Sequence, residues 1–328
     1  MKALSNQDGI IAAAAMDQRG SLQKSLASAK GVGPKDITWD MMSEFKTAVT
    51  RILTPHASAI LLDPEYGLDA AKARSSNAGL LLAYEESGYD NTKPGRLPDL
   101  LPHVSAKRIV DWGADAVKIL IYYSPFDEVS VNDIKHAFIE RIGAECEDLQ
   151  IPFFLEFVGY DEGLDEKGLE YAKKKPAIVT GSMAEFTKDR YGVDVLKVEV
   201  PVNMKFVEGA KSFGGQAAYT RYQAKRLFLE SAKVVTKPFI YLSAGVSNAE
   251  FTESLALAAE SGVRFAGVLC GRATWKDGMA VYGKQGGAAF RAWLEKQGVE
   301  NIKNVNAALK PASPWFSFYG VTSADQLA

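Results

Sequence analysis

Short apolar runs recur along the whole chain, and this repetition constrains the fold more than any other feature of the sequence. Eight runs can be counted, and several are apolar at consecutive rather than alternate positions. Strands of a parallel sheet that is covered on both faces have this pattern. The runs span residues 10–17, 57–63, 79–85, 115–123, 151–158, 194–200, 238–245 and 264–271.

Segments with helical spacing separate most of these runs. Ser247 and Glu250 form a capping box before one such segment, and Gly262 is expected to end that helix. Ser130 and Asp133 are placed like a capping pair for another helix. The predicted helices span residues 39–53, 104–112, 130–146, 220–235 and 251–261.

The alternation of runs and helices predicts an α/β fold in which the strands close into a (β/α)8 TIM barrel. A doubly wound open sheet is the alternative, but neither GxGxxG nor GxxxxGK[ST] follows the first run. No Ser/Gly-rich linker divides the chain, so a single domain over residues 1–328 is expected. The tail after about residue 316 is predicted to lie on the surface, with its last residues mobile.

The composition narrows the range of partners. The chain has 328 residues, 47% of them hydrophobic and 24% charged, with a net charge of −2, which fits a soluble protein that binds no nucleic acid.

Cys146 and Cys270 are far apart and lack metal-like spacing, which predicts a reduced, cytoplasmic protein. Residues 10–16 are interpreted as a core strand and not an export signal, because Asp8 and Asp17 flank them. No run approaches the roughly 18 apolar residues of a membrane helix, so no membrane partner is expected.

Charged residues stand at regular places in these apolar runs. Side chains alternate along a strand with period two, so Lys197 and Glu199 in the sixth run share one face. Because Pro201 ends the run, this pair is predicted to face the barrel interior near its carboxyl end, where barrel enzymes have their active sites. Asp17 and Asp63 end the first two runs and are candidates for contacts to a substrate.

Two neighbouring runs carry further inward charges, Lys118 in the fourth and Glu156 in the fifth. With Lys197, they lie on adjacent strands if the connections follow sequence order. An ion-pair network with a purely structural role is the alternative interpretation. Burying ions costs several kcal/mol each unless they are paired, and apolar packing could be as stable, so three such charges favour a function.

Two lysines and a glutamate suit Schiff-base chemistry. A buried lysine beside a second cation loses its proton more readily, and the neutral amine attacks a carbonyl carbon. A carboxyl group must then move protons while the carbinolamine loses water. Lys118, Glu156 and Lys197 together therefore predict a Schiff-base aldolase.

A metal-dependent aldolase or epimerase is the alternative chemistry. Zinc sites need clustered imidazole or thiolate ligands. The three histidines of the chain lie in predicted loops or helices without ligand spacing, and they are His56, His103 and His136. We therefore expect no metal and no other cofactor.

The last two runs end in segments that suit an anion. Ser243-Ala244-Gly245 leads from the seventh run toward a capped helix, and Gly271-Arg272 follows the eighth. Glycines allow backbone N–H groups to approach an anion, and arginine can bind phosphate through two hydrogen bonds. Tight turns with a surface arginine are the alternative, but the loops after strands seven and eight form a common phosphate site in barrels.

Long motifs at every strand end resemble those of class I tagatose-1,6-bisphosphate aldolases, a family of Schiff-base enzymes with a barrel fold. The resemblance runs over nearly the whole chain, to ASPW at 312–315. The motifs are DQRG at 17–20, LLDPEYG at 61–67, GADAVK at 113–118, IPFFLE at 151–156, DVLKVEVPV at 194–202, YLSAGVS at 241–247 and GVLCGRATW at 267–275.

The resemblance implies reversible cleavage of tagatose 1,6-bisphosphate to dihydroxyacetone phosphate and glyceraldehyde 3-phosphate, in the tagatose 6-phosphate pathway of lactose metabolism. It implies that Lys197 forms the Schiff base, Glu156 is the acid/base carboxyl group and Lys118 is the helper cation. Lys205 lies outside the motif and is interpreted as a loop residue. The implied contacts to substrate hydroxyls or phosphates come from Asp17, Gln18, Arg19, Ser243, Gly245, Leu269, Gly271 and Arg272.

The sequence does not distinguish tagatose 1,6-bisphosphate from other ketose phosphates as the substrate. Fructose 1,6-bisphosphate is an expected second substrate, because enzymes of this type tolerate changes in sugar stereochemistry. The sulfofructose-phosphate aldolases share the KVE-x-P and GRA-x-W patterns and are an alternative assignment. A barrel that binds sugar phosphates without turnover is a third hypothesis. A homo-oligomer is expected from the family alone.

Overall fold

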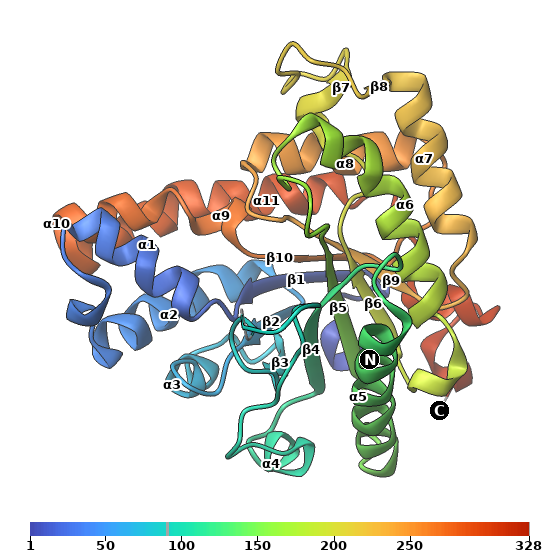
Figure 1. Cartoon of the computed structure of the whole chain (residues 1–328). Coiled ribbons are helices and arrows are strands. Elements are labelled where there is room, and N and C mark those ends of the chain that lie inside the picture. Colours follow the sequence, from blue (N-terminus) through green and yellow to red (C-terminus); the bar gives the residue numbers. More distant parts are fainter. Residues whose placement is uncertain (90–91, 328) are drawn as a thin grey trace.

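The structure of the chain is a computed structural model that describes residues 1–89 and 92–327, so residues 90, 91 and 328 of the predicted domain lie outside the described residues. Eight parallel strands close into a barrel in the order β1-β10-β9-β6-β5-β4-β3-β2 (Figure 1). The predicted (β/α)8 barrel is confirmed, and an open sheet is excluded because each of the eight strands pairs with two neighbours, which leaves no edge strand. The barrel strands are β1 (Ile11–Met16), β2 (Ala59–Leu62), β3 (Gly79–Ala83), β4 (Ala116–Tyr123), β5 (Phe153–Gly159), β6 (Val195–Val198), β9 (Phe239–Leu242) and β10 (Gly267–Cys270).

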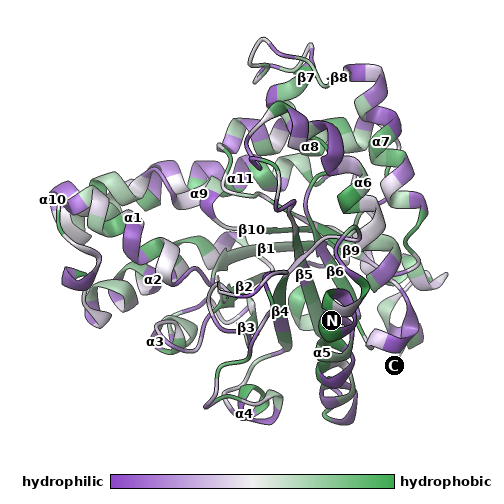
Figure 2. Cartoon of the chain, in the orientation of Figure 1, coloured by the Kyte–Doolittle hydropathy of each residue, from purple (hydrophilic) through white to green (hydrophobic). Residues whose placement is uncertain are grey.

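Helices surround the barrel and turn their polar faces outward (Figure 2). A two-stranded ribbon, β7 (Val207–Glu208) and β8 (Tyr219–Thr220), projects from the body at the top of Figure 1. The α-helices are α1 (Gly20–Lys30), α2 (Trp39–Leu53), α3 (Leu68–Lys72), α4 (Ala106–Asp111), α5 (Val129–Asp148), α6 (Leu169–Phe186), α7 (Arg221–Lys233), α8 (Asn248–Glu260), α9 (Arg272–Trp275), α10 (Gly278–Trp293) and α11 (Val299–Ala308).

Helix capping follows the sequence in part at α8 and not at α5. The Ser247 Oγ accepts a hydrogen bond from the Glu250 N–H at 3.2 Å, but the reciprocal bond of the predicted capping box, from the Ser247 N–H to the Glu250 carboxylate, is absent among the described residues. Helix α8 ends two residues before Gly262, as predicted. Helix α5 instead begins at Val129 without a side-chain cap, so the predicted Ser130–Asp133 capping pair is wrong. The reason is that the carbonyl group of Glu128 already accepts the amides of the first turn, which places Ser130 inside the helix.

The apolar core has two parts, one on each side of the strands. Outward-facing strand residues pack against the helices, and inward-facing residues such as Ala13, Leu81 and Phe154 fill the barrel. Trp315, which is 6% exposed, covers the amino-terminal end of the barrel, where its backbone N–H donates to the Gly9 carbonyl oxygen at 3.0 Å. Trp315 thus lies just before the predicted tail, whose residues 316–327 are half-buried or exposed, and mobility of the last residues stays a prediction.

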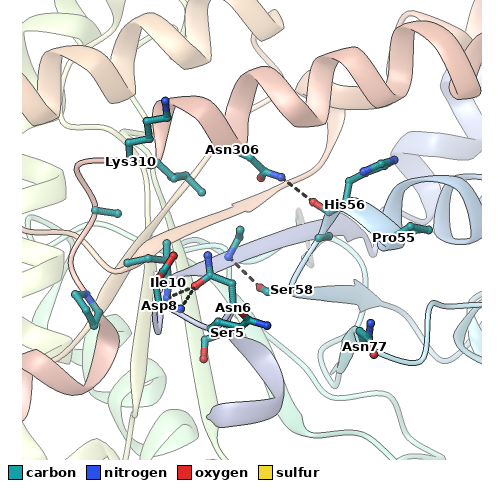
Figure 3. A pocket seen from close by; sticks show the side chains of 16 residues that line it. Ser5, Asn6, Asp8, Ile10, Pro55, His56, Ser58, Asn77, Asn306 and Lys310 are labelled. Atoms are coloured by element: carbon teal, nitrogen blue, oxygen red, sulfur yellow. Dashed lines mark hydrogen bonds between the residues drawn. The ribbon is translucent and has the colours of Figure 1, made fainter. Parts of the chain in front are cut away.

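A groove of about 830 Å³ lies at this same amino-terminal end (Figure 3). The Asn306 amide donates to the His56 carbonyl oxygen at 2.7 Å, and the Ser58 Oγ accepts the Ala12 N–H at 2.9 Å. Polar groups of the groove are therefore used in joining β1 and β2 to the helix layer. None of the predicted site residues lines this groove.

Within residues 1–89 and 92–327, no helix has the length and apolar character needed to cross a membrane.

Candidate active site

The three strand residues that were predicted to face inward meet inside the barrel. Lys197 on β6 and Glu156 on β5 are register partners, and the Lys197 Nζ lies 2.7 Å from the Glu156 Oε2. The Lys118 Nζ, from β4, lies 2.9 Å from the same oxygen. All three side chains are buried, with Lys118 at 0%, Lys197 at 3% and Glu156 at 6% exposure. One carboxylate oxygen thus contacts two lysine amines.

Lys118 has three carboxylate neighbours. Its Nζ lies 2.8 Å from Asp17 and 2.8 Å from Glu85, in addition to Glu156. Burial by itself would lower the pKa of Lys118, but Asp17, Glu156 and Glu85 outweigh it and raise the pKa well above its usual range. Burial likewise would raise the pKa of Asp17, but Lys118 and Lys197 outweigh it, and that pKa is lowered. Lys118 is therefore an ammonium group held by carboxylates at neutral pH.

Glu85 belongs to this cluster, and the sequence reasoning missed it. It is 5% exposed and follows the end of β3 by two residues. Its Oε1 binds Lys118, whereas its Oε2 is buried without a hydrogen-bond partner among the described residues. The third run ends in a carboxylate just as the first two runs end in Asp17 and Asp63, and that shared pattern was the available signal.

The segment after β1 reaches the cluster, but its residues differ in their freedom to bind a ligand. Asp17 contacts Lys118, and the Gln18 Oε1 is buried without a partner among the described residues. Arg19 is 5% exposed and donates to the Glu85 carbonyl oxygen at 2.7 Å and to the Glu65 carboxylate at 3.1 Å. Arg19 thus joins the ends of β1 and β3, and a contact from it to substrate stays a prediction.

Asp63, another predicted substrate contact, is fully buried. Its carboxylate lies 2.5 Å from the Nζ of Lys46, a residue of α2, and also accepts the Tyr66 N–H at 2.9 Å. Lys46 donates in turn to the carbonyl oxygens of Met16 and Gln18, each at 2.7 Å. Asp63 therefore holds Lys46 against the backbone at the end of β1, and a contact from Asp63 to substrate stays a prediction.

The predicted phosphate residues come together where β9 and β10 end. Ala244 and Gly245 both have positive φ angles, 47° and 79°. A Cβ built on Gly245 would lie 2.8 Å from the Arg272 Cζ, so the two loops are in contact. Gly271 faces the Gln18 amide, because a Cβ there would lie 3.4 Å from the Gln18 Nε2.

Two predicted members of this region are buried. Ser243, directly after β9, is 6% exposed, and Leu269 on β10 is 1% exposed and faces the barrel interior. The Ser243 hydroxyl interacts with the thiol of Cys270, and burial raises the pKa of that thiol to about 12. Leu269 thus forms part of the apolar floor beneath the loops, next to Ile240.

Glu199 and Lys205 do not join Lys197. The expectation that Glu199 shares the inward face of Lys197 stays a prediction: β6 ends at Val198, but Val200 still packs with Leu196 and Val198 in the core on the helix side of the strands. The Glu199 carboxylate lies 3.0 Å from the Lys175 Nζ of α6. Lys205 is an exposed residue of the turn after β6, in agreement with its interpretation as a loop residue.

Potential metal ligands are scattered. Among residues 1–89 and 92–327, no three His, Cys, Asp or Glu side chains are placed to hold a metal ion. The histidines lie on separate elements: His56 follows α2, His103 precedes α4 and His136 is in α5. Cys146 and Cys270 are both free thiols.

Comparison with known proteins identifies related sequences over nearly the whole chain. The model of the DeoC/LacD family aldolases matches residues 11–277. Tagatose 1,6-diphosphate aldolase from Listeria monocytogenes serotype 4a is 53% identical over 323 residues, which cover 98% of this chain and 94% of that protein. Tagatose 1,6-diphosphate aldolase 2 from Enterococcus faecalis is 52% identical, covering 96% and 94% of the two chains.

Solved structures with the same barrel are more distant in sequence. A fructose-bisphosphate aldolase from Plasmodium falciparum superposes with a TM-score of 0.68 at 13% identity, covering 95% of this chain and 93% of that one. An archaeal fructose 1,6-bisphosphate aldolase gives a TM-score of 0.54 at 15% identity, covering 90% and 96%. At this level of identity the likeness supports the fold.

Proposed function

This chain belongs to the DeoC/LacD family of aldolases, and we propose that it reversibly cleaves D-tagatose 1,6-bisphosphate to dihydroxyacetone phosphate and glyceraldehyde 3-phosphate through a Schiff base on Lys197. The observation that carries this proposal is the contact of Lys197 and Lys118 with one oxygen of Glu156 inside the barrel. The names of the relatives from Listeria and Enterococcus support the choice of substrate.

The first step is attack of the Lys197 amine on the C2 carbonyl carbon of the open-chain ketose. The amine must be neutral to attack, and its Nζ lies 2.7 Å from the Glu156 oxygen that can accept its proton and that Lys118 also contacts. Glu156 takes the proton that the amine loses and gives it to the departing hydroxyl group. The carbinolamine thereby loses water and becomes an iminium ion.

The second step breaks the C3–C4 bond. A base removes the proton of the C4 hydroxyl group, the C4–O bond becomes a carbonyl, and the electron pair of the C3–C4 bond moves toward the iminium nitrogen. We assign the base to Glu156, because among the three carboxylates that contact Lys118 it is the one that also contacts Lys197, to whose nitrogen the substrate is bonded. Protonation of the resulting enamine at C3 and hydrolysis release dihydroxyacetone phosphate and restore Lys197.

The substrate orientation follows from groups that lack partners. Gln18 Oε1 and Glu85 Oε2 are buried polar atoms without partners among the described residues, and leaving each one unpaired costs about 1–3 kcal/mol. Substrate hydroxyl groups would supply the missing hydrogen bonds. One phosphate would lie in the loops of Ser243, Gly245, Gly271 and Arg272, which contact one another across β9 and β10.

Fructose 1,6-bisphosphate differs from the tagatose compound only in configuration at C4, and we expect it to be cleaved as well. The test is steady-state cleavage of both bisphosphates and of a sulfonated ketose phosphate, with and without a chelator. Turnover of either bisphosphate that is lost in Lys197→Ala and unaffected by chelation would support the proposal. Preference for the sulfonated ketose would change the assigned substrate to a sulfonated ketose phosphate. Binding of the sugar phosphates without turnover would contradict the proposal that the protein is an aldolase.

We further propose a cytoplasmic location and a homo-oligomeric state. The location is supported by two free, buried thiols, as expected in a reducing compartment. The oligomer is supported by exposed apolar side chains near the start of α5, including Phe126 at 57% and Val129 at 75% exposure. Light scattering of the purified protein that gives the mass of one chain would contradict the oligomer.

A further inference from the structure

A buried carboxylate that does not contact the proposed nucleophile connects the two strands that carry the site. The Glu199 Oε2 accepts a hydrogen bond from the Gly159 N–H at 2.8 Å, and its Oε1 lies 3.0 Å from the Lys175 Nζ. Glu199 and Lys175 are 7% and 8% exposed. Glu199 follows Lys197 by two residues, and Gly159 follows Glu156 by three.

This connection begins where the backbone pairing of the two strands stops. The register of β5 with β6 ends at the pair Glu156–Lys197, and β6 itself ends at Val198. Beyond that pair, toward the carboxyl ends of the strands, the hydrogen bond from the Gly159 N–H to the Glu199 carboxylate therefore links the two strands where backbone pairing has stopped. Lys175 connects the same carboxylate to α6, so that the helix layer also holds the two strand ends.

The space around Gly159 shows how closely this connection is built. A Cβ on Gly159 would lie 2.7 Å from the Ile178 Cγ2, 3.0 Å from the Tyr171 hydroxyl and 3.4 Å from the Glu199 Oε2. Glycine is thus required for the backbone amide to reach the carboxylate. Because both oxygens of Glu199 are occupied, this carboxylate has no free position from which to act as a base.

We propose that Glu199 is a positioning residue that sets the distance between the Lys197 amine and the Glu156 carboxylate. The inference rests on the proposed Schiff base at Lys197. Displacing reacting groups by about 1 Å can cost about 100-fold in rate, even when the change is made outside the reacting atoms. Loss of the connection should therefore lower the rate of iminium formation more than substrate binding.

The test compares variants that remove the connection without leaving an unpaired buried charge. The pair Glu199→Met with Lys175→Met removes both ions and the hydrogen bond to Gly159. We expect it to lower kcat by about 10- to 100-fold, to change KM by less than about threefold, and to slow borohydride trapping in parallel. Glu199→Gln with Lys175→Met restores an oxygen that can accept the Gly159 N–H and should recover most of the lost rate.

The chain offers a matched control on the same two strands. At their amino-terminal ends, the Asp194 Oδ2 accepts the Phe153 N–H at 2.8 Å, which is the same kind of side-chain link. Asp194→Leu should lower the melting temperature but leave kcat within about twofold, since this link lies at the opposite end of the strands. An equal loss of kcat in both variants would show that the effect is general loosening of the barrel.

A double-mutant cycle with Glu156→Gln completes the test. If Glu199 acts through Glu156, the two methionine substitutions should cost less than about threefold in the Glu156→Gln background. Full additivity, or wild-type kcat in the double methionine variant, would overturn the inference while leaving the proposed function intact. Absence of cleavage and trapping in the wild type would instead remove the proposed function on which the inference rests.

Discussion

At the scale of single residues, the two lysines of the site differ in the number of carboxylates that each one contacts. Lys118 has three such neighbours, whereas Lys197 has only Glu156 among the described residues. The carboxylates raise the pKa of Lys118 although burial opposes them, so Lys118 remains charged. Lys197 is therefore the amine that we expect to react.

Replacing Lys118 by methionine should lower kcat by at least about 100-fold, because the fixed positive charge beside Glu156 is lost. Lys135→Met is a matched control: Lys135 is also fully buried, and its Nζ lies 3.2 Å from the Asp127 carboxylate outside the site. Both variants should be less stable to urea, and only Lys118→Met should lose activity. A Lys118→Met enzyme with kcat within twofold of the wild type would contradict this role.

The lowered pKa of Asp17 predicts how the free energy of unfolding depends on pH. Burial acts to raise its pKa, but Lys118 and Lys197 lower it below the usual value of about 3.9. Ionised Asp17 thus stabilises the fold above about pH 4, and the stabilisation is lost as the pH falls toward the lowered pKa. Urea unfolding should show Asp17→Asn to be less stable at pH 7 and to lose less stability than the wild type between about pH 5 and 2. Equal slopes in the two proteins would contradict the prediction.

At the scale of elements, the loops after β9 and β10 depend on one glycine. Gly245 has a φ of 79°, and a Cβ there would lie 2.8 Å from the Arg272 Cζ. Gly245→Ala should therefore move Arg272 and raise KM for the bisphosphate by about 10- to 100-fold, the effect of losing a hydrogen bond to a charged group. Titration of initial rates measures this change.

Gly262 offers the control for backbone strain. It has a similar φ of 76°, and a Cβ there would meet nothing within 4 Å. Gly262→Ala should cost about 1–2 kcal/mol of stability without changing KM. Equal KM values for Gly245→Ala and the wild type would show that Arg272 is not part of the phosphate site.

The elements also show what the sequence can predict. All eight barrel strands were found because each lies in a short, mostly apolar run, whereas the short strands β7 and β8 were not, and α2 was found with its bounds, Trp39–Leu53. Helices α6 and α10 were not predicted, because Pro176 stands inside the first and Gly286, with a φ of 81°, inside the second. Tertiary packing against the barrel outweighs these unfavourable residues.

The site was predictable where it depends on strand alternation. Lys118, Glu156 and Lys197 were placed together because side chains on a strand repeat with period two. Glu85 was not, because it lies two residues beyond the end of β3, and the partners of Glu199, which are Lys175 on α6 and the Gly159 N–H, do not follow from alternation along β6. The partner of Asp63 is Lys46 on a helix, and contacts between helix and sheet do not follow from a pattern along one strand.

At the scale of the whole molecule, we expect the amino-terminal end of the barrel to contribute to stability and the carboxyl end to carry the reaction. Trp315 and the N-terminal residues cover the amino-terminal end, and the charged cluster lies toward the carboxyl end. Trp315→Ala should lower the free energy of unfolding by about 3–5 kcal/mol, because a large buried side chain is lost. Chemical denaturation measures this change, and kcat of the folded variant should remain within about twofold. A loss of kcat beyond tenfold in folded protein would show that the two ends are coupled.

The central claim is that the Lys197 amine bonds covalently to the ketose, and borohydride reduction tests it most directly. Protein should be incubated with tagatose 1,6-bisphosphate or fructose 1,6-bisphosphate, reduced and digested, and the peptides weighed by mass spectrometry. We predict a stable adduct on the peptide that carries Lys197, and none in Lys197→Ala. An adduct on Lys205 or Lys118, or turnover that survives Lys197→Ala, would contradict the account.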